Sequence, residues 1–225
     1  DMLFVFFITA AVLIWFNAAL KNMKQNGALK KLPFKLYCMV GIFCGLAILT
    51  KGPLGLLLPL IAIVSISFHL YGARAALSQL SVGWLTSLMI AVPWYWMAAV
   101  SRPDEFFQRQ IFFENISRFF GGNGISVKPI WYYLGQFWLH AAPWSFLYLV
   151  VPTMYVLRKS NQVREYFVKN FSLHDIQIVK SLTIWIVAYM VFFSLSSGKR
   201  TAYLLTILPP LAIISSQVLT GILSP

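Results

Sequence analysis

Long apolar runs alternate with short polar stretches along most of this sequence. A run of ~20 mostly apolar residues can cross the hydrocarbon core of a bilayer as an α-helix. Because hydrocarbon offers no hydrogen-bond partners, such a run satisfies its backbone groups only by becoming helical. We therefore predict an all-α, polytopic transmembrane helical bundle, with residues 1–225 as one partial transmembrane domain. Seven segments fit this description: 3–20, 36–50, 53–70, 80–100, 131–157, 176–196 and 202–222.

The second and third segments are joined by a short stretch, Thr50-Lys51-Gly52-Pro53. Without a break there, they would form one helix of about 35 residues, which is far longer than a bilayer requires. Glycine commonly ends a helix, and proline commonly begins one. We therefore predict a tight turn at 50–53, with a lysine where two spanning helices meet.

Composition agrees with this pattern. Hydrophobic residues make up 59% of the 225 residues, charged ones only 11%, and the mean hydropathy is +0.74. A soluble domain has about 25% charged residues, because water solvates its surface. In a soluble protein, the net charge of +12 would suggest a nucleic-acid partner. Here the positive residues lie in short loops between apolar segments, which is typical of membrane topology and of contact with anionic lipid.

The distribution of Lys and Arg predicts the orientation of the chain. Eleven of these residues fall on one side of the predicted spans and seven on the other. The first side also has a dense basic cluster in the short loop 21–35, and basic short loops stay in the cytoplasm. Residue 1, the 50–53 turn and the 101–130 loop are then on the outer face.

The 101–130 loop is the longest on the predicted outer face, and it is rich in phenylalanine and isoleucine. Ser101 followed by Asp104 resembles a helix capping box, with Pro103 in the first turn. Two acidic–basic pairs have the i,i+4 spacing that a helix brings together. We therefore predict an amphipathic helix over 103–120 at the membrane interface. The two pairs are Glu105 with Arg109 and Glu114 with Arg118.

Three outer positions offer cations at the mouths of different helices: Lys51, Arg118 and Lys199 followed by Arg200. Each could be an interfacial anchor among lipid headgroups, as could Tyr203. If they converge, they would form a basic pocket for a lipid phosphate. Arginine suits this role because its planar fork matches phosphate oxygens. The residues alone leave both interpretations open: interfacial anchors, or ligands of a lipid phosphate.

Histidine and carboxylate residues add little chemistry. His140 lies inside an apolar segment, and no spacing such as His-x-x-x-His predicts a metal site, so no cofactor is assigned and a divalent metal has no supporting ligands. Inverting sugar transfer would need a carboxylate base. Glu114 beside Arg118 is better suited to an ion pair, which lowers its basicity. The catalytic residue is therefore unknown from this sequence.

Several motifs follow one another along the chain in a recognisable order. Their series resembles the bacterial membrane glycosyltransferases of the GT-C fold, in particular the aminoarabinose lipid A transferases and the dolichyl-phosphate-mannose protein mannosyltransferase superfamily. The resemblance covers roughly residues 36–215. The motifs are Gly-Leu-Ala-Ile-Leu-Thr-Lys-Gly-Pro (45–53), Pro-Trp-Tyr-Trp (93–96), Phe-Phe-Glu-Asn-Ile-Ser-Arg-Phe-Phe-Gly-Gly (112–122), Lys-Pro-Ile-Trp-Tyr-Tyr-Leu (128–134), Pro-Trp (143–144) and Phe-Phe-Ser-Leu-Ser-Ser-Gly-Lys-Arg-Thr-Ala-Tyr (192–203).

The resemblance implies sugar transfer from a polyprenyl phosphate to a lipid A-like or protein acceptor, at the periplasmic face of the bacterial inner membrane. It places four residues at the donor phosphate or its cavity, and three more in support. The family's catalytic aspartate lies in an outer loop after the first span, upstream of this sequence, so the piece alone is expected to be inactive. The four are Lys51, Arg118, Lys199 and Tyr203; the supporting three are Glu114, Asn115 and Arg109.

One segment departs from the aminoarabinose transferases. They have His-Glu-His before the arginine, whereas this chain has Phe113-Glu114-Asn115, which removes possible metal ligands and weakens the assignment of that sugar. Two other functions remain open: a transporter or flippase for a polyprenyl-linked sugar, and a non-enzymatic membrane assembly subunit. A transporter would be expected to show paired half-helices or internal repeats.

Overall fold

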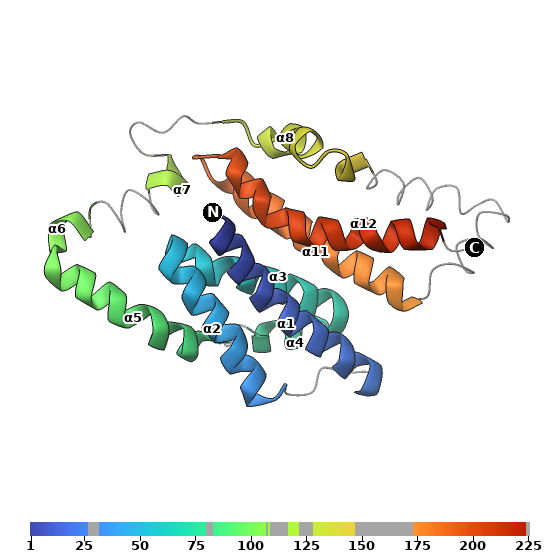
Figure 1. Ribbon diagram of the computed structural model, residues 1–225, viewed down its shortest axis with the longest axis horizontal. Helices are drawn as coiled ribbons and strands as arrows, with labels where there is room; N and C mark the ends of the chain where they lie inside the picture. The colour runs from blue at the N-terminus through green and yellow to red at the C-terminus, as the bar shows by residue number, and fades with distance from the viewer. Residues whose placement is uncertain are drawn as a thin grey trace.

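The computed structural model describes residues 1–26, 32–79, 83–106, 108, 117–121, 128–146 and 173–223. Their regular elements are helices, and the expected all-α membrane fold is confirmed (Figure 1). The elements are α1 (Met2–Asn26), α2 (Phe34–Lys51), α3 (Leu54–Tyr71), α4 (Ala73–Ser78), α5 (Trp84–Ser101), α6 (Pro103–Glu105), α7 (Arg118–Phe120), α8 (Tyr132–His140), α11 (Leu173–Leu195), η3 (Thr201–Ile207) and α12 (Leu208–Leu223).

Six stretches in the described part of the chain are long and apolar enough to cross a bilayer, so this is a multi-pass membrane protein. They overlap six of the seven predicted segments. The seventh, 131–157, begins with α8, which ends at His140 ahead of Pro143; the residue before a proline avoids the helical conformation. Residues 147–157 lie outside the described part, so a span there stays a prediction. The six are Met2–Met23, Phe34–Lys51, Leu54–Tyr71, Trp84–Ser101, Asp175–Leu195 and Thr201–Thr220.

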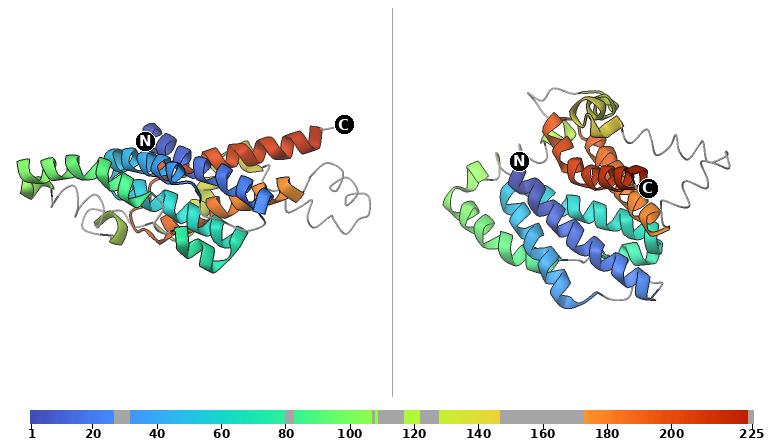
Figure 2. Two further views of the ribbon diagram at one scale, coloured as in Figure 1. Left: turned by 90° about the horizontal axis from the view of Figure 1, so that it is seen from below. Right: turned by 45° about the vertical axis from the view of Figure 1, so that its right-hand side comes forward.

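Helix α3 is central to the bundle, because it contacts α1, α2, α4 and α11. Helix α1 lies against α2 and α3, α11 lies against α3 and α12, and α5 contacts α2 at one edge (Figures 1 and 2). The fully buried Trp15 of α1 and Trp185 of α11 are among the largest core side chains. Trp15 Nε1 also donates to Gln79 Oε1 at 3.0 Å, which fixes the end of α4 to α1.

Successive spans run in opposite directions, so alternate loops share one end of the bundle (Figure 1). One end has the start of α1, the α2–α3 turn, the end of α5, α7 and the start of η3. We call it the Lys51 end. The opposite end has the end of α1, the start of α2 and the start of α11. This arrangement brings three of the sequence motifs, near 51, 118 and 199, to the same end.

The predicted capping box at Ser101 is wrong. Ser101 is the last residue of α5, where Arg102 N donates to Ala98 O at 3.1 Å. The N-cap of α6 is Arg102, and it makes no side-chain capping bond. A helical backbone at Ser101 excludes the extended conformation that a capping serine needs. Pro103 does occupy the start of α6, as expected. Half of the predicted 103–120 helix, residues 107 and 109–116, lies outside the described residues.

Candidate functional site

The α2–α3 turn fixes Lys51 at the end of its helix, and the predicted tight turn is confirmed. Gly52 has φ 69°, in the left-handed region that favours glycine, and its N–H donates to Ile48 O at 2.7 Å. At Gly55, a β-carbon would lie 2.2 Å from Ile48 N, so a side chain there has no space. The two helices can therefore approach this closely only with glycine at position 55.

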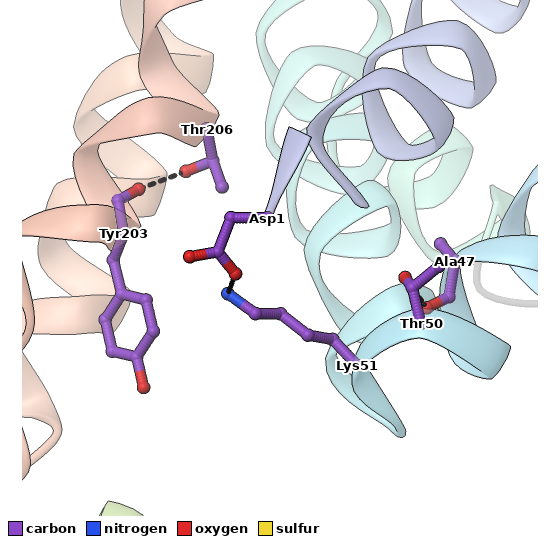
Figure 3. Close-up of polar contacts among 6 residues, drawn as sticks. All are labelled: Asp1, Ala47, Thr50, Lys51, Tyr203 and Thr206. Carbon is purple, nitrogen blue, oxygen red and sulfur yellow. Dashed lines mark hydrogen bonds and ion pairs between the residues drawn. The ribbon is translucent and has the colours of Figure 1, made fainter. Parts of the chain in front are cut away.

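The Lys51 ammonium group lies among a carboxylate and two aromatic rings. Figure 3 shows the Asp1 carboxylate and the Tyr203 ring. Its Nζ is 2.5 Å from Asp1 Oδ1, and the two side chains keep 27% and 41% of their surface exposed. The same Nζ lies over the rings of Phe4 and Tyr203, at 5.2 and 5.5 Å from their centroids, within the range of a cation–π contact. Because both side chains are only partly covered, an anion can approach this pair.

Tyr203 reaches Lys51 from η3, a seven-residue 3₁₀ helix. Just downstream, Pro209 and Pro210 have no N–H to donate to the carbonyl groups of Leu205 and Thr206. Thr206 Oγ1 donates to Tyr203 O at 2.7 Å (Figure 3). The Tyr203 ring stacks on Phe193 of α11, with centroids 4.8 Å apart and planes 19° apart. These contacts fix the ring that lies over the Lys51 ammonium.

Lys199 has different surroundings. The residue is only 5% exposed, and its Nζ donates to Ser196 O at 2.5 Å and to Lys128 O at 3.1 Å. Burial lowers the pKa of this ammonium group, because its charged form loses hydration. The two carbonyl bonds act in the opposite direction, since they favour the charged form.

The backbone of α7 places Arg118 beside the end of α11. Ser197 N donates to Phe119 O at 2.9 Å, and the Phe119 ring lies 5.7 Å from that of Phe192. The Arg118 side chain is outside the described atoms, and so are residues 109, 114 and 115. The predicted roles of Arg118, Arg109, Glu114 and Asn115 therefore stay predictions.

The structure thus brings together some of the predicted site residues. Lys51 and Tyr203 are in contact, whereas the Lys199 ammonium bonds the Lys128 carbonyl. The sequence did not predict the pair of Asp1 with Lys51, because fifty positions separate the two residues. It also missed Tyr133, whose hydroxyl bonds the backbone of Arg200. The aromatic-rich 128–134 motif was the available signal for the latter.

Basic residues outnumber acidic ones at the Lys51 end of the described bundle. An excess of cations around a partly buried site attracts anions, and the effect is stronger at low ionic strength. The described chain contains no group of three or more His, Cys, Asp or Glu side chains that could bind a metal ion. The basic residues are Lys51, Arg102, Arg118, Lys128, Lys199 and Arg200; the acidic ones are Asp1, Asp104 and Glu105.

An apolar groove lies close to the same turn. Its volume is about 510 Å³, and it runs between α3 and α5 along α2. It begins at Pro53, two residues after Lys51, and includes Trp84 near the start of α5. Such a lining favours hydrocarbon rather than water. The lining residues are Ile48, Pro53, Leu56, Leu57, Leu60, Trp84, Leu88, Ala91, Val92 and Tyr95.

These features define a helical membrane protein with a basic, aromatic-lined site at one end of its spans. Comparison with known proteins gives its relationships. Residues 1–107 match the family described as dolichyl-phosphate-mannose-protein mannosyltransferase. Over 96% of its length, the chain superposes on 36% of ArnT from Cupriavidus metallidurans, crystallised with undecaprenyl phosphate, with a TM-score of 0.57 and 21% sequence identity.

Two curated relatives are undecaprenyl phosphate-alpha-4-amino-4-deoxy-L-arabinose arabinosyl transferases. The one from Shewanella sediminis is 30% identical over 194 residues, 84% of this chain and 31% of the relative. The one from Pseudomonas fluorescens is 31% identical over 180 residues, 80% of this chain and 30% of the relative. These matches bear out the resemblance to the membrane glycosyltransferases of the GT-C fold. It spans about a third of the length of these curated relatives.

Proposed function

We propose that the full-length protein transfers a sugar from a polyprenyl phosphate to a lipid acceptor, at the periplasmic face of the bacterial inner membrane. The observation that supports this most is the partly exposed Lys51 side chain, which lies beside Tyr203 at the end of a spanning helix, two residues before Pro53 in the lining of an apolar groove. A polyprenyl phosphate combines an anionic head with a hydrocarbon chain, so this pair of features matches its chemistry.

The proposed reaction is a single displacement at the anomeric carbon of the sugar. The acceptor oxygen forms a bond to this carbon, and the bond to the lipid phosphate breaks. Negative charge then develops on the leaving phosphate, and Lys51 and Arg118 stabilise it. The acceptor proton passes to a carboxylate base. Asp1 is poorly suited to that role, because its carboxylate is already paired with the Lys51 ammonium. By family resemblance, the base comes from an outer loop upstream of these residues.

The groove between α3 and α5 is proposed to bind the first isoprene units of the donor. From Trp84 to Tyr95 the helix rises ~16 Å, at ~1.5 Å per residue. The chain would thus run from the Lys51 end into the bilayer, and the phosphate would remain near the ammonium group. The names of the curated relatives support an undecaprenyl phosphate donor and an aminoarabinose sugar. The sequence difference at 113–115 leaves that sugar to be tested.

Donor turnover by the purified full-length protein in liposomes tests the proposal. Wild-type protein should convert a labelled undecaprenyl-phosphate sugar to glycosylated lipid and free undecaprenyl phosphate. Lys51→Ala should lose at least about tenfold of the rate, since a charged hydrogen bond contributes ~1.5–3 kcal/mol. Lys35→Ala, an exposed lysine at the opposite end, is the matched control and should keep the wild-type rate.

The products separate this proposal from its alternatives. Movement of intact donor across the bilayer without any glycosylated product would indicate a flippase. Neither movement nor product, from a correctly folded full-length protein, would indicate an assembly subunit.

The orientation has its own test. Single cysteines at Asn26 and Asn123, in a protein without Cys38 and Cys44, can be labelled on intact cells with an impermeant thiol reagent. We expect labelling at 123 and protection at 26, because the 21–35 loop is basic. Labelling at 26 with protection at 123 would place the Lys51 end in the cytoplasm and exclude a periplasmic site.

A further inference from the structure

The loop that joins α11 to η3, Ser196–Arg200, bonds three other parts of the chain; we call it the 196–200 loop. Ser197 N donates to Phe119 O of α7 at 2.9 Å. Lys199 Nζ donates to Lys128 O at 3.1 Å. Arg200 bonds the Tyr133 hydroxyl of α8 through both of its backbone polar groups. Three segments that are far from this loop in the sequence therefore bond to its five residues.

The Lys199 ammonium lies at the centre of these contacts. Its partners, Ser196 O and Lys128 O, belong to the end of α11 and to the segment that leads into α8. A buried ammonium is unfavourable unless it is well hydrogen-bonded. Of the three N–H donors of a lysine, two are used here. The side chain thus has a structural reason to stay where it is, 5% exposed and directed at backbone oxygen.

Tyr133 fixes the next residue of the loop. Its hydroxyl accepts from Arg200 N at 3.0 Å and donates to Arg200 O at 3.1 Å, so both functions of the hydroxyl are used by one residue. The Tyr133 side chain is almost fully buried, and its ring lies 6.2 Å from Phe193. Phe193 also stacks on Tyr203. The rings of Tyr133, Phe193 and Tyr203 therefore form one aromatic cluster beside the loop.

These contacts determine where the proposed phosphate site is assembled. Tyr203 N donates to Arg200 O at 3.1 Å, so η3 begins directly from the fixed residue. Three positions later in the chain, the Tyr203 ring lies over Lys51 Nζ. At the other end of the loop, Ser197 fixes α7, in which Arg118 is the first residue. Displacement of the 196–200 loop would therefore move Tyr203 and Arg118 together.

We infer that Lys199 is a positioning residue: its buried ammonium fixes the 196–200 loop, which places Tyr203 over Lys51 and α7 beside them. The inference rests on the proposed function of the Lys51 end, and it differs from the prediction that Lys199 binds the donor phosphate. A phosphate ligand should present its cation to the site, as Lys51 does with 27% of its side chain exposed. Lys199 presents its cation to carbonyl groups of the protein.

Substitutions of Lys199 in the full-length protein test this inference, with Lys180→Met as the matched control. Lys180 is an exposed lysine of α11, near the start of that helix and away from the Lys51 end. We expect Lys199→Met to lower kcat for sugar transfer at least about tenfold, with KM for the donor changed less than about threefold. Lys180→Met should leave kcat within about twofold of wild type.

Lys199→Arg distinguishes the two roles further. A phosphate site accepts a guanidinium readily, whereas a pocket of two carbonyls built for a compact ammonium has less room for it. We therefore expect kcat to fall nearly as far in Lys199→Arg as in Lys199→Met. Wild-type kcat in Lys199→Arg, together with a raised KM and an unchanged kcat in Lys199→Met, would identify Lys199 as a ligand and overturn the inference.

Amide hydrogen exchange gives a measurement that needs no sugar transfer. Loss of the Lys199 bonds should speed exchange in peptides that contain Ser197 and Arg200, whereas Lys180→Met should leave exchange in these peptides unchanged. Unchanged exchange in Lys199→Met contradicts the inference even if the wild-type protein transfers no sugar. If Lys199→Met fails to fold, Tyr133→Phe removes both bonds to Arg200 from the α8 side, and we expect faster exchange and a lower kcat there too. Wild-type values in Tyr133→Phe would then overturn it.

Discussion

The α2–α3 turn and the 196–200 loop both place a lysine at the end of a spanning helix, but they do so by different means. In the turn, Gly52 and Gly55 bring two helices together, and the Lys51 ammonium is directed at other side chains. In the loop, the lysine itself makes the connection by bonding two carbonyl groups. The comparison shows that a cation at a helix end can be a binding group or a structural one, depending on what surrounds its ammonium.

Gly55→Ala should give the largest effect, because the turn depends on the close approach of α2 and α3 at this glycine. A β-carbon at this position would lie 2.2 Å from Ile48 N and 2.3 Å from Ala47 C, both backbone atoms that cannot move alone. We expect a loss of about 3 kcal/mol or failure to fold. Thermal unfolding in detergent, followed by tryptophan fluorescence, measures it.

Gly135→Ala is the matched control for that experiment. No atom lies within 4 Å of the β-carbon that it would add, and the position is inside α8. Alanine is favoured over glycine in helices by up to ~1 kcal/mol, so the variant should be at least as stable as wild type. A Gly55→Ala protein as stable as Gly135→Ala would show that the close approach of α2 and α3 is not required.

Arg118→Lys should give the next largest effect. A planar guanidinium can bind two phosphate oxygens at once, whereas lysine supplies a point charge. We expect normal membrane insertion and at least about a tenfold loss of sugar transfer in the full-length protein. Because Arg118 and Lys51 are proposed to bind the same phosphate, the loss in the double variant with Lys51→Ala need not equal the sum of the two. Wild-type transfer by Arg118→Lys would reduce the arginine to an interfacial anchor.

A substitution in the apolar groove between α3 and α5 should give the smallest effect. Leu57→Trp, in the lining near Lys51, should reduce the space for a hydrocarbon chain. We expect KM for an undecaprenyl donor to rise about threefold. Each CH₂ group excluded from the groove would lose ~0.8 kcal/mol of burial free energy. Val187→Trp on α11, another exposed apolar position, serves as the control. Equal KM values for the two variants would argue against a chain in the groove.

Much of the fold could be predicted because one constraint dominates it. In hydrocarbon an apolar run must be helical, so the spans followed from length and composition, and Gly52-Pro53 marked the break between two of them. The capping box predicted at Ser101 is wrong because α5 continues through that residue. The length needed to span the bilayer favours this continuation over the short local capping pattern. Local patterns of this kind do not report which helix a residue joins.

The site could be predicted only in part, because its contacts are between residues far apart in sequence. The motifs near 51, 118 and 199 were expected to meet at one end, and their backbones do. The ion pair of Lys51 with Asp1 depends on how α1 packs beside α2, and the carbonyl partners of Lys199 depend on the path of the 128–134 segment. No sequence pattern separates an ammonium that faces a site from one that is buried on carbonyl oxygen.

Equilibrium binding of undecaprenyl phosphate to the full-length protein tests the central claim most directly, because it needs neither the sugar nor the acceptor. Wild type, Lys51→Ala and Lys35→Ala can be compared in the same detergent by native mass spectrometry. We expect Lys51→Ala to bind at least about tenfold more weakly than wild type, and Lys35→Ala to bind as wild type does. Equal affinity in all three proteins would contradict a phosphate site at Lys51.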